Sequence, residues 1–173
     1  MINNKEKIFS LTWENTKSQA LFLGLASVSI VLPMFIHLQW VAGPIVNAIL
    51  IIALVFCGIR SALLLAMIPS VVALSSGLLP AVLAPVVPFI MISNVILVLV
   101  VDYFQRKNNY LIGLVSGAFL KFIFLFASVS LISSLLYKME LATIVAQMMS
   151  WPQFYTAIIG GLLAWVFIKK FNK

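Results

Sequence analysis

The sequence predicts an all-α, polytopic membrane protein in which six transmembrane helices form one bundle over residues 1–173. Hydrophobic residues make up 64% of the chain and charged residues only 9%, whereas a typical soluble domain is about half apolar and about a quarter charged. Apolar segments close to the roughly 20 residues of a membrane-spanning helix recur along the chain. These observations predict a single integral membrane domain with little room for a soluble one.

Prolines, glycines and charges set the bounds of the predicted spans. The first ends near His37, the second begins at Pro44, and the fourth begins around Pro85 and Pro88. Proline costs little in the first turn of a helix, because the N–H there is unpaired anyway. The second span is short and the third carries Pro69, so these two are the weakest. The six spans cover about 18–36, 44–59, 61–79, 86–104, 110–136 and 153–169.

The distribution of basic residues predicts the orientation of the bundle. If the N-terminus is cytoplasmic, all 11 Lys and Arg residues except Lys121 and Lys138 lie on the cytoplasmic side. The outer loops 37–43 and 80–85 carry no basic residue, and such a bias in short loops sets the orientation of membrane proteins. We therefore expect the N- and C-termini to be cytoplasmic.

Lys121 lies in the middle of an otherwise uncharged, mostly apolar stretch, residues 113–132. A charge at that depth costs roughly 2.5 kcal/mol or more, so an intramembrane lysine marks a functional site by default. No acidic residue lies in the central part of a predicted span. Three outcomes are open: the lysine loses its proton, it extends toward the membrane surface, or it pairs with an anionic or electron-rich group of a solute. The four acidic residues of the chain are Glu6, Glu14, Asp102 and Glu140.

The helical face that carries Lys121 is mostly small or polar, which predicts that it points into the bundle. The structural alternative to a ligand site is a lysine that hydrogen-bonds helix carbonyls or Asn94. We favour the functional interpretation because of the cost of an intramembrane charge. The residues of this face are Gly113, Gly117, Lys121, Phe124 and Ser128.

Amide and aromatic side chains gather in the outer half of the predicted bundle, as in a pocket for a small polar molecule. Each has a structural alternative: the aromatic residues can anchor the protein at the membrane interface, His37 can be solvated, and Asn94 can join helices. The candidate substrate-binding residues are Lys121, Asn94, His37, Gln39, Trp40, Asn47, Trp151, Gln153 and Tyr155.

Rows of small residues predict close helix packing on three of the helices. Most should serve packing within the chain. The row on the first helix has a second interpretation, because it could receive another membrane subunit. The rows are Ala20, Gly24 and Ser27 in the first helix, Gly113 and Gly117 in the fifth, and Gly160, Gly161 and Ala164 in the sixth.

The remaining chemistry of the chain is sparse. One Cys and one His cannot build a structural zinc site or an internal disulfide. The sequence has no phosphate-binding loop, nucleophile elbow or dinucleotide turn. We therefore expect no enzyme activity, no metal and no cofactor bound by this chain, and an ATPase would have to be another chain.

The chain resembles the substrate-binding S components of energy-coupling-factor (ECF) transporters. Besides the size and the span count, the resemblance rests on four segments. They are residues 37–48 (HLQWVAGPIVNA), residues 85–94 (PVVPFIMISN), the GxxxG at 113–117 that runs into Lys121, and Ala20-x-x-x-Gly24, which is similar to the family's AxxxA docking motif but has Gly in the second place.

This resemblance implies a function in the plasma membrane of a prokaryote. The chain would bind a vitamin or similar micronutrient on the extracellular side, without an ATPase of its own. It would dock, through Ala20, Gly24 and Ser27, on a transmembrane coupling subunit with two ATPase subunits that use ATP. Two other classes stay open: a small membrane channel, whose pore should show charged rings or polar stripes, and a membrane-protein assembly factor.

Overall fold

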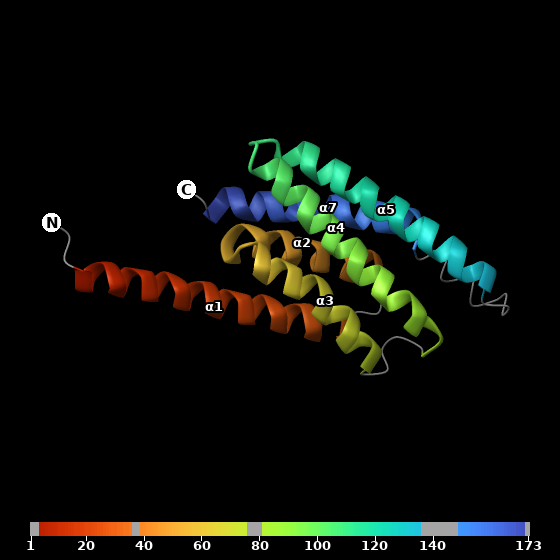
Figure 1. Ribbon diagram of the computed structural model, residues 1–173, viewed down its shortest axis with the longest axis horizontal. Coiled ribbons are helices and arrows are strands. Elements are labelled where there is room, and N and C mark those ends of the chain that lie inside the picture. The colour runs from red at the N-terminus through yellow and green to blue at the C-terminus, as the bar shows by residue number, and fades with distance from the viewer. Residues whose placement is uncertain (1–3, 36–38, 76–80, 136–148, 172–173) are drawn as a thin grey trace.

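The computed structural model describes residues 4–35, 39–75, 81–135 and 149–171. These residues form six α-helices and one short 3-10 helix, and none of the described residues lies in a strand. The helices lie lengthwise beside one another, with α1 along one side of the bundle (Figure 1). The elements are α1 (Asn4–Phe35), α2 (Gln39–Cys57), α3 (Ile59–Ser75), η1 (Ala81–Val86), α4 (Val87–Gln105), α5 (Tyr110–Leu135) and α7 (Trp151–Phe171).

Helix α2 is central to the packing, since it contacts α1, α3, α4 and α7. Helix α5 completes the bundle against α4 and α7, whereas α1 packs mainly on α2 and α3. In a bilayer, helix association comes from close van der Waals packing rather than from escape from water. The core accordingly combines several buried alanines with large, fully buried aliphatic side chains, among them Leu50, Ile51, Leu65, Leu97 and Leu114.

Glycines allow the closest helix approaches, as the sequence predicted for the fifth and sixth spans. A Cβ atom at Gly160 would collide with the backbone oxygen of Pro44 and lie 2.7 Å from Cβ of Asn47, both on α2. A Cβ atom at Gly113 would lie 2.7 Å from Cβ of Phe104 on α4. Both packing faces are therefore confirmed.

The all-α bundle of the membrane type is confirmed, and each predicted span corresponds to a helix. Within the part of the chain that the structure describes, four helical segments are long and apolar enough to cross a bilayer: Trp40–Cys57, Ala84–Gln105, Tyr110–Leu131 and Trp151–Phe171. The apolar parts of the other two helices, Thr16–Leu32 and Ile59–Val72, are shorter. Crossing by α1 and α3 therefore stays a prediction.

The second helix begins earlier than the sequence predicted. It starts at Gln39, so Trp40 lies in the first turns of α2 and not in an outer loop, and Pro44 lies inside the helix. A proline so near the N-terminus removes the N–H that would pair with the carbonyl of Trp40 and leaves the rest of the ladder intact. The predicted start at Pro44 is wrong for this reason.

The first helix also extends beyond its predicted span. Helix α1 begins at Asn4 and runs through the charged residues that precede the apolar segment. Lys and Glu are good helix formers, so charge ends the membrane-spanning part of a helix but not the helix itself. The predicted start of the fourth helix is confirmed, because Pro88 occupies the first turn of α4 after the 3-10 helix that contains Pro85.

Candidate functional site

Lys121 reaches from the middle of α5 to two asparagines on other helices. Its Nζ atom lies 2.7 Å from Oδ1 of Asn47 on α2 and 2.7 Å from Oδ1 of Asn94 on α4. The exposed fractions of Lys121, Asn47 and Asn94 are 2%, 2% and 5%. Distances of about 2.7–2.9 Å are typical of charge-assisted N–H···O bonds, so the geometry suits an ammonium group.

Hydrogen bonds to the backbone orient both amides. Nδ2 of Asn47 donates to the carbonyl of Gly43 at 2.9 Å, and Nδ2 of Asn94 donates to the carbonyl of Ala66 on α3 at 3.3 Å. Each amide therefore turns its oxygen toward Lys121. The structural role foreseen for Asn94, a polar link between helices, is present here, and the bonds connect α2, α3, α4 and α5.

Lys121 has no carboxylate partner among the residues that the structure describes. Asp102 pairs instead with Arg106 at 2.9 Å, near the C-terminal end of α4. An ammonium group donates three hydrogen bonds, whereas the described part of the chain supplies Lys121 with two acceptors, both neutral amides. A protonated Lys121 would give the centre a positive charge that the amide dipoles stabilise but do not neutralise.

A cavity of about 190 Å³ adjoins this centre. It lies toward the end of the bundle where α2, α4 and α7 begin and α3 ends, which is the end predicted to face outward. Half of its lining residues are polar, the rest apolar or small. They are Ala42, Gly43, Val46, Asn47, Pro69, Ser70, Ile90, Asn94, Lys121 and Gln153.

Other buried polar side chains near the centre are occupied by their own helices. The hydroxyl groups of Ser93, Ser128 and Thr156 donate to the carbonyls of Ile90, Phe124 and Gln153, respectively. Such local bonds satisfy a hydroxyl within a helix and leave it little capacity for a ligand. We therefore assign these three residues to packing.

The structure brings together four of the nine predicted binding residues. Asn47, Asn94, Lys121 and Gln153 line the cavity. His37 lies outside the described residues, and Gln39 is placed only as the first residue of α2.

The predicted aromatic contacts lie elsewhere. Trp40, Trp151 and Tyr155 are 58%, 58% and 50% exposed and do not line this cavity. Trp151 stacks on Phe122 of α5 with ring centroids 4.9 Å apart. These placements match the anchoring alternative for each aromatic residue, because Trp and Tyr concentrate at membrane interfaces.

Sequence reasoning missed Ser70, the polar residue that α3 contributes to the cavity. Ser70 is 8% exposed and follows Pro69, inside an otherwise apolar helix. A polar residue next to a mid-helix proline is a usable signal, because proline frees a backbone carbonyl and often accompanies irregular packing.

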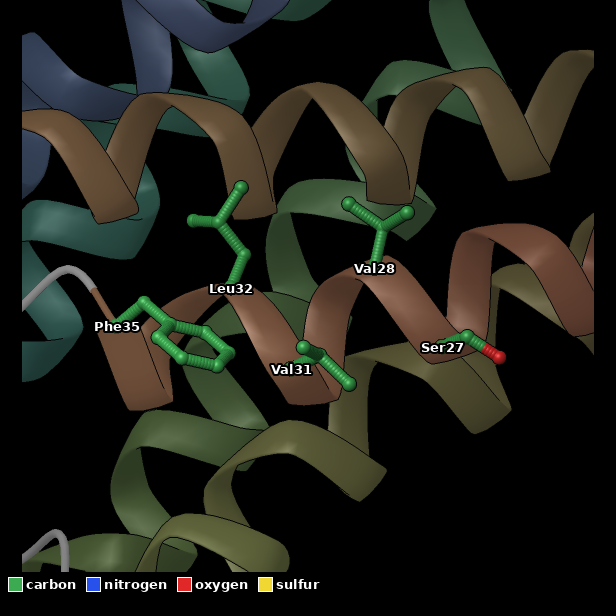
Figure 2. A pocket seen from close by; sticks show the side chains of 5 residues that line it. All are labelled: Ser27, Val28, Val31, Leu32 and Phe35. Atoms are coloured by element: carbon green, nitrogen blue, oxygen red, sulfur yellow. The ribbon is translucent and has the colours of Figure 1, made fainter.

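The row of small residues on α1 is uncovered. Ala20, Gly24 and Ser27 are exposed, and nothing lies within 4 Å of a Cβ atom built at Gly24. Farther along the same helix is a shallow hollow of about 510 Å³ (Figure 2). The described residues that line it all belong to α1: Ser27, Val28, Val31, Leu32 and Phe35.

No protein-family model, curated protein or solved structure matches this chain.

Proposed function

We propose that this chain is the substrate-binding S subunit of an ECF-type importer. It binds a small solute on the extracellular side and docks on a coupling subunit that carries two ATPase subunits. The observation that carries the proposal is the cavity beside Lys121, a buried lysine for which the described residues supply no carboxylate. The solute is a vitamin or a similar micronutrient.

The free-energy cost of burying a charged residue at this centre favours a role in binding. Replacing buried charged residues by apolar ones of similar volume is often neutral or stabilising, so such a group is seldom needed for stability alone. Here a charged residue and two amides converge beside a cavity instead of filling it. Intramembrane charges that face an internal cavity commonly mark solute pathways.

The exposed face of α1 supports docking on another membrane subunit. Gly24 leaves its helix surface open, and small residues let a second helix approach closely in a bilayer. The sequence has no ATP-binding motif, so the energy for import comes from partner subunits. Four helices that can cross a membrane account for the association with the lipid bilayer.

Co-purification tests the proposal directly. The chain is expressed with a candidate coupling subunit and two ATPases from neighbouring genes, and the purified protein is denatured and analysed for released small molecules. We expect a stable complex and one solute in near-stoichiometric amount. Conductance in a planar bilayer without a bound solute would instead support the channel alternative.

Labelling from outside tests the side on which the cavity lies. In a Cys57→Ser background, single cysteines at Trp40 and Ala81 should react with an impermeant thiol reagent on intact cells, and one at Asn108 should not. The reason is the bias of basic residues toward the end of the bundle that carries Arg106 and Lys107. Reaction at Asn108 in sealed cells would place the cavity on the cytoplasmic side and exclude uptake from outside.

A further inference from the structure

We propose that the site beside Lys121 selects a compact monocarboxylate, that is, a solute with one negative charge and roughly six to ten non-hydrogen atoms. This inference rests on the proposed function, since it assumes that the cavity is the solute site. It adds the charge of the solute, its size and the end of the solute that contacts Lys121.

The charge of the solute follows from the charges of the side chains at the buried centre. When protonated, Lys121 supplies one positive charge, and no carboxylate of the described residues compensates it. One carboxylate would bring the buried site to neutrality, whereas a dicarboxylate would leave an uncompensated negative charge at a depth where charge is costly. A phosphate monoester carries about −1.5 to −2 near pH 7, so it also fits less well.

The position of the carboxylate follows from the hydrogen bonds of the ammonium group. Asn47 and Asn94 accept two of its three protons, and their own Nδ2 atoms bind backbone carbonyls. The two amides therefore hold Nζ in place. Lys121 also lines the cavity, so a solute there is positioned to accept the third proton. The carboxylate should bind at this end.

The size follows from the cavity. Its volume of about 190 Å³ lies below the roughly 300–1,000 Å³ of sites for drug-sized molecules. It slightly exceeds the roughly 150 Å³ of an engineered, closed cavity that binds benzene. Because the cavity beside Lys121 is partly open, this volume measures the part of the solute that it encloses. The rest of the lining is mixed, with Val46, Pro69 and Ile90 as apolar wall and Ser70 and Gln153 as polar contacts.

Two sets of matched probes test the inference on the purified full-length chain. The first set is benzoate, benzamide and isophthalate, and the second is hexanoate, hexanamide and adipate. Within each set the monocarboxylate and the amide have the same size and shape and differ in charge, whereas the dicarboxylate adds a second carboxylate and is larger, so the amide is the control for charge. Binding is measured by thermal unfolding in detergent over a range of probe concentrations, and any solute that co-purifies is identified by mass spectrometry in both ion modes.

In the wild type, we expect at least one monocarboxylate to bind at least about thirtyfold more tightly than its amide and its dicarboxylate, as for the loss of one partner of a buried charge pair. Lys121→Met should abolish this preference, while the control Lys107→Met, which changes an exposed lysine near the cytoplasmic end of α4, should keep it. A co-purified solute should carry a single negative charge.

The inference is overturned if neither monocarboxylate is preferred in the wild type, or if the preference persists in Lys121→Met. The comparison among probes is made within the wild type, so it does not depend on whether the variant folds. Failure of this inference can be distinguished from failure of the proposed function. A monocarboxylate preference without any complex with a coupling subunit would refute the function alone, and a complex without the preference would refute the inference alone.

Discussion

Helices α7 and α1 each carry a row of small residues, but the row on α7 is buried inside the bundle and the row on α1 is exposed. Gly160, Gly161 and Ala164 face α2 and α5, and added side-chain atoms at the glycines would collide with these helices. Gly24 has open space where its side chain would be. The same sequence feature thus packs against other helices of the chain in α7, whereas in α1 no described residue covers it.

This difference separates residues that hold the fold from residues that are available to a partner. The close approach at Gly160 also supports the site, because Gly160 packs on Asn47, which binds Lys121. Changes in the row on α7 should therefore lower the stability of the chain and disturb its cavity. Changes in the row on α1 should leave both intact and alter only association with another subunit.

The largest effect is expected for Gly160→Ala. The new Cβ atom would meet the backbone of Pro44, which cannot move away as the end of a flexible side chain can. Overpacking of this kind typically costs about 1–3 kcal/mol, so the free energy of unfolding in detergent should fall by about that amount. The measurement is thermal or denaturant unfolding of the purified chain. An unchanged midpoint would mean that α2 and α7 are not so closely packed.

The next largest effect is expected for Gly24→Leu in the proposed complex with a coupling subunit. A bulky side chain on the open face of α1 should hinder the approach of a helix of the coupling subunit. We expect about a tenfold or greater loss of affinity for that subunit, which corresponds to about 1.4 kcal/mol. Solute binding should be unchanged, and the free energy of unfolding should be unchanged or higher by up to about 1 kcal/mol, because Leu is a better helix former than Gly.

The matched control is Val115→Leu, which enlarges an exposed side chain on α5. Co-purification of the coupling subunit, quantified for both variants and the wild type, provides the readout. If Gly24→Leu retains the subunit at the wild-type level, the face of α1 around Gly24 is not the docking surface.

Much of the fold could be predicted from the sequence, because a bilayer imposes length and hydropathy on every span. The buried face of α5 was predicted from the spacing of Gly113, Gly117 and Lys121, since 3.6 residues per turn place them together. The start of α2 could not be predicted in this way, because a proline in the sixth position of a helix resembles the first residue of a helix in the sequence. Helix ends depend on local hydrogen bonds that composition does not reveal.

Less of the site could be predicted. Lys121 and the two asparagines stand out as polar residues in apolar helices, and the structure joins them. Their mutual distances depend on how four helices pack, which no local pattern specifies. Trp40 and Trp151 were grouped with them because they share the outer end of the bundle, but a shared depth says nothing about which way a side chain points.

A smaller effect is expected for the coupling between Asn47 and Lys121. Asn47→Leu removes an acceptor from a buried donor, which usually costs about 1–3 kcal/mol. In a Lys121→Met background the donor is absent, so the same change should cost less, by about 0.6–2 kcal/mol. Unfolding of the four proteins of this double-mutant cycle measures the difference. Equal costs in both backgrounds would show that the two side chains do not interact.

The smallest effect is expected for Gly24→Ala, the counterpart on α1 of the change at Gly160. Apart from its chain neighbours and the adjacent backbone of α1, no described residue has an atom within 4 Å of the added Cβ, so no overpacking against another helix opposes it. Alanine also loses less conformational freedom than glycine in a helix, which favours it by roughly 0.5–1 kcal/mol. The free energy of unfolding should therefore stay unchanged or rise by up to about that amount, measured beside Gly160→Ala under identical conditions. A loss of stability comparable to that of Gly160→Ala would mean that the row on α1 is covered in the isolated protein, for example by a second copy of the chain, and the distinction between the two rows would fail.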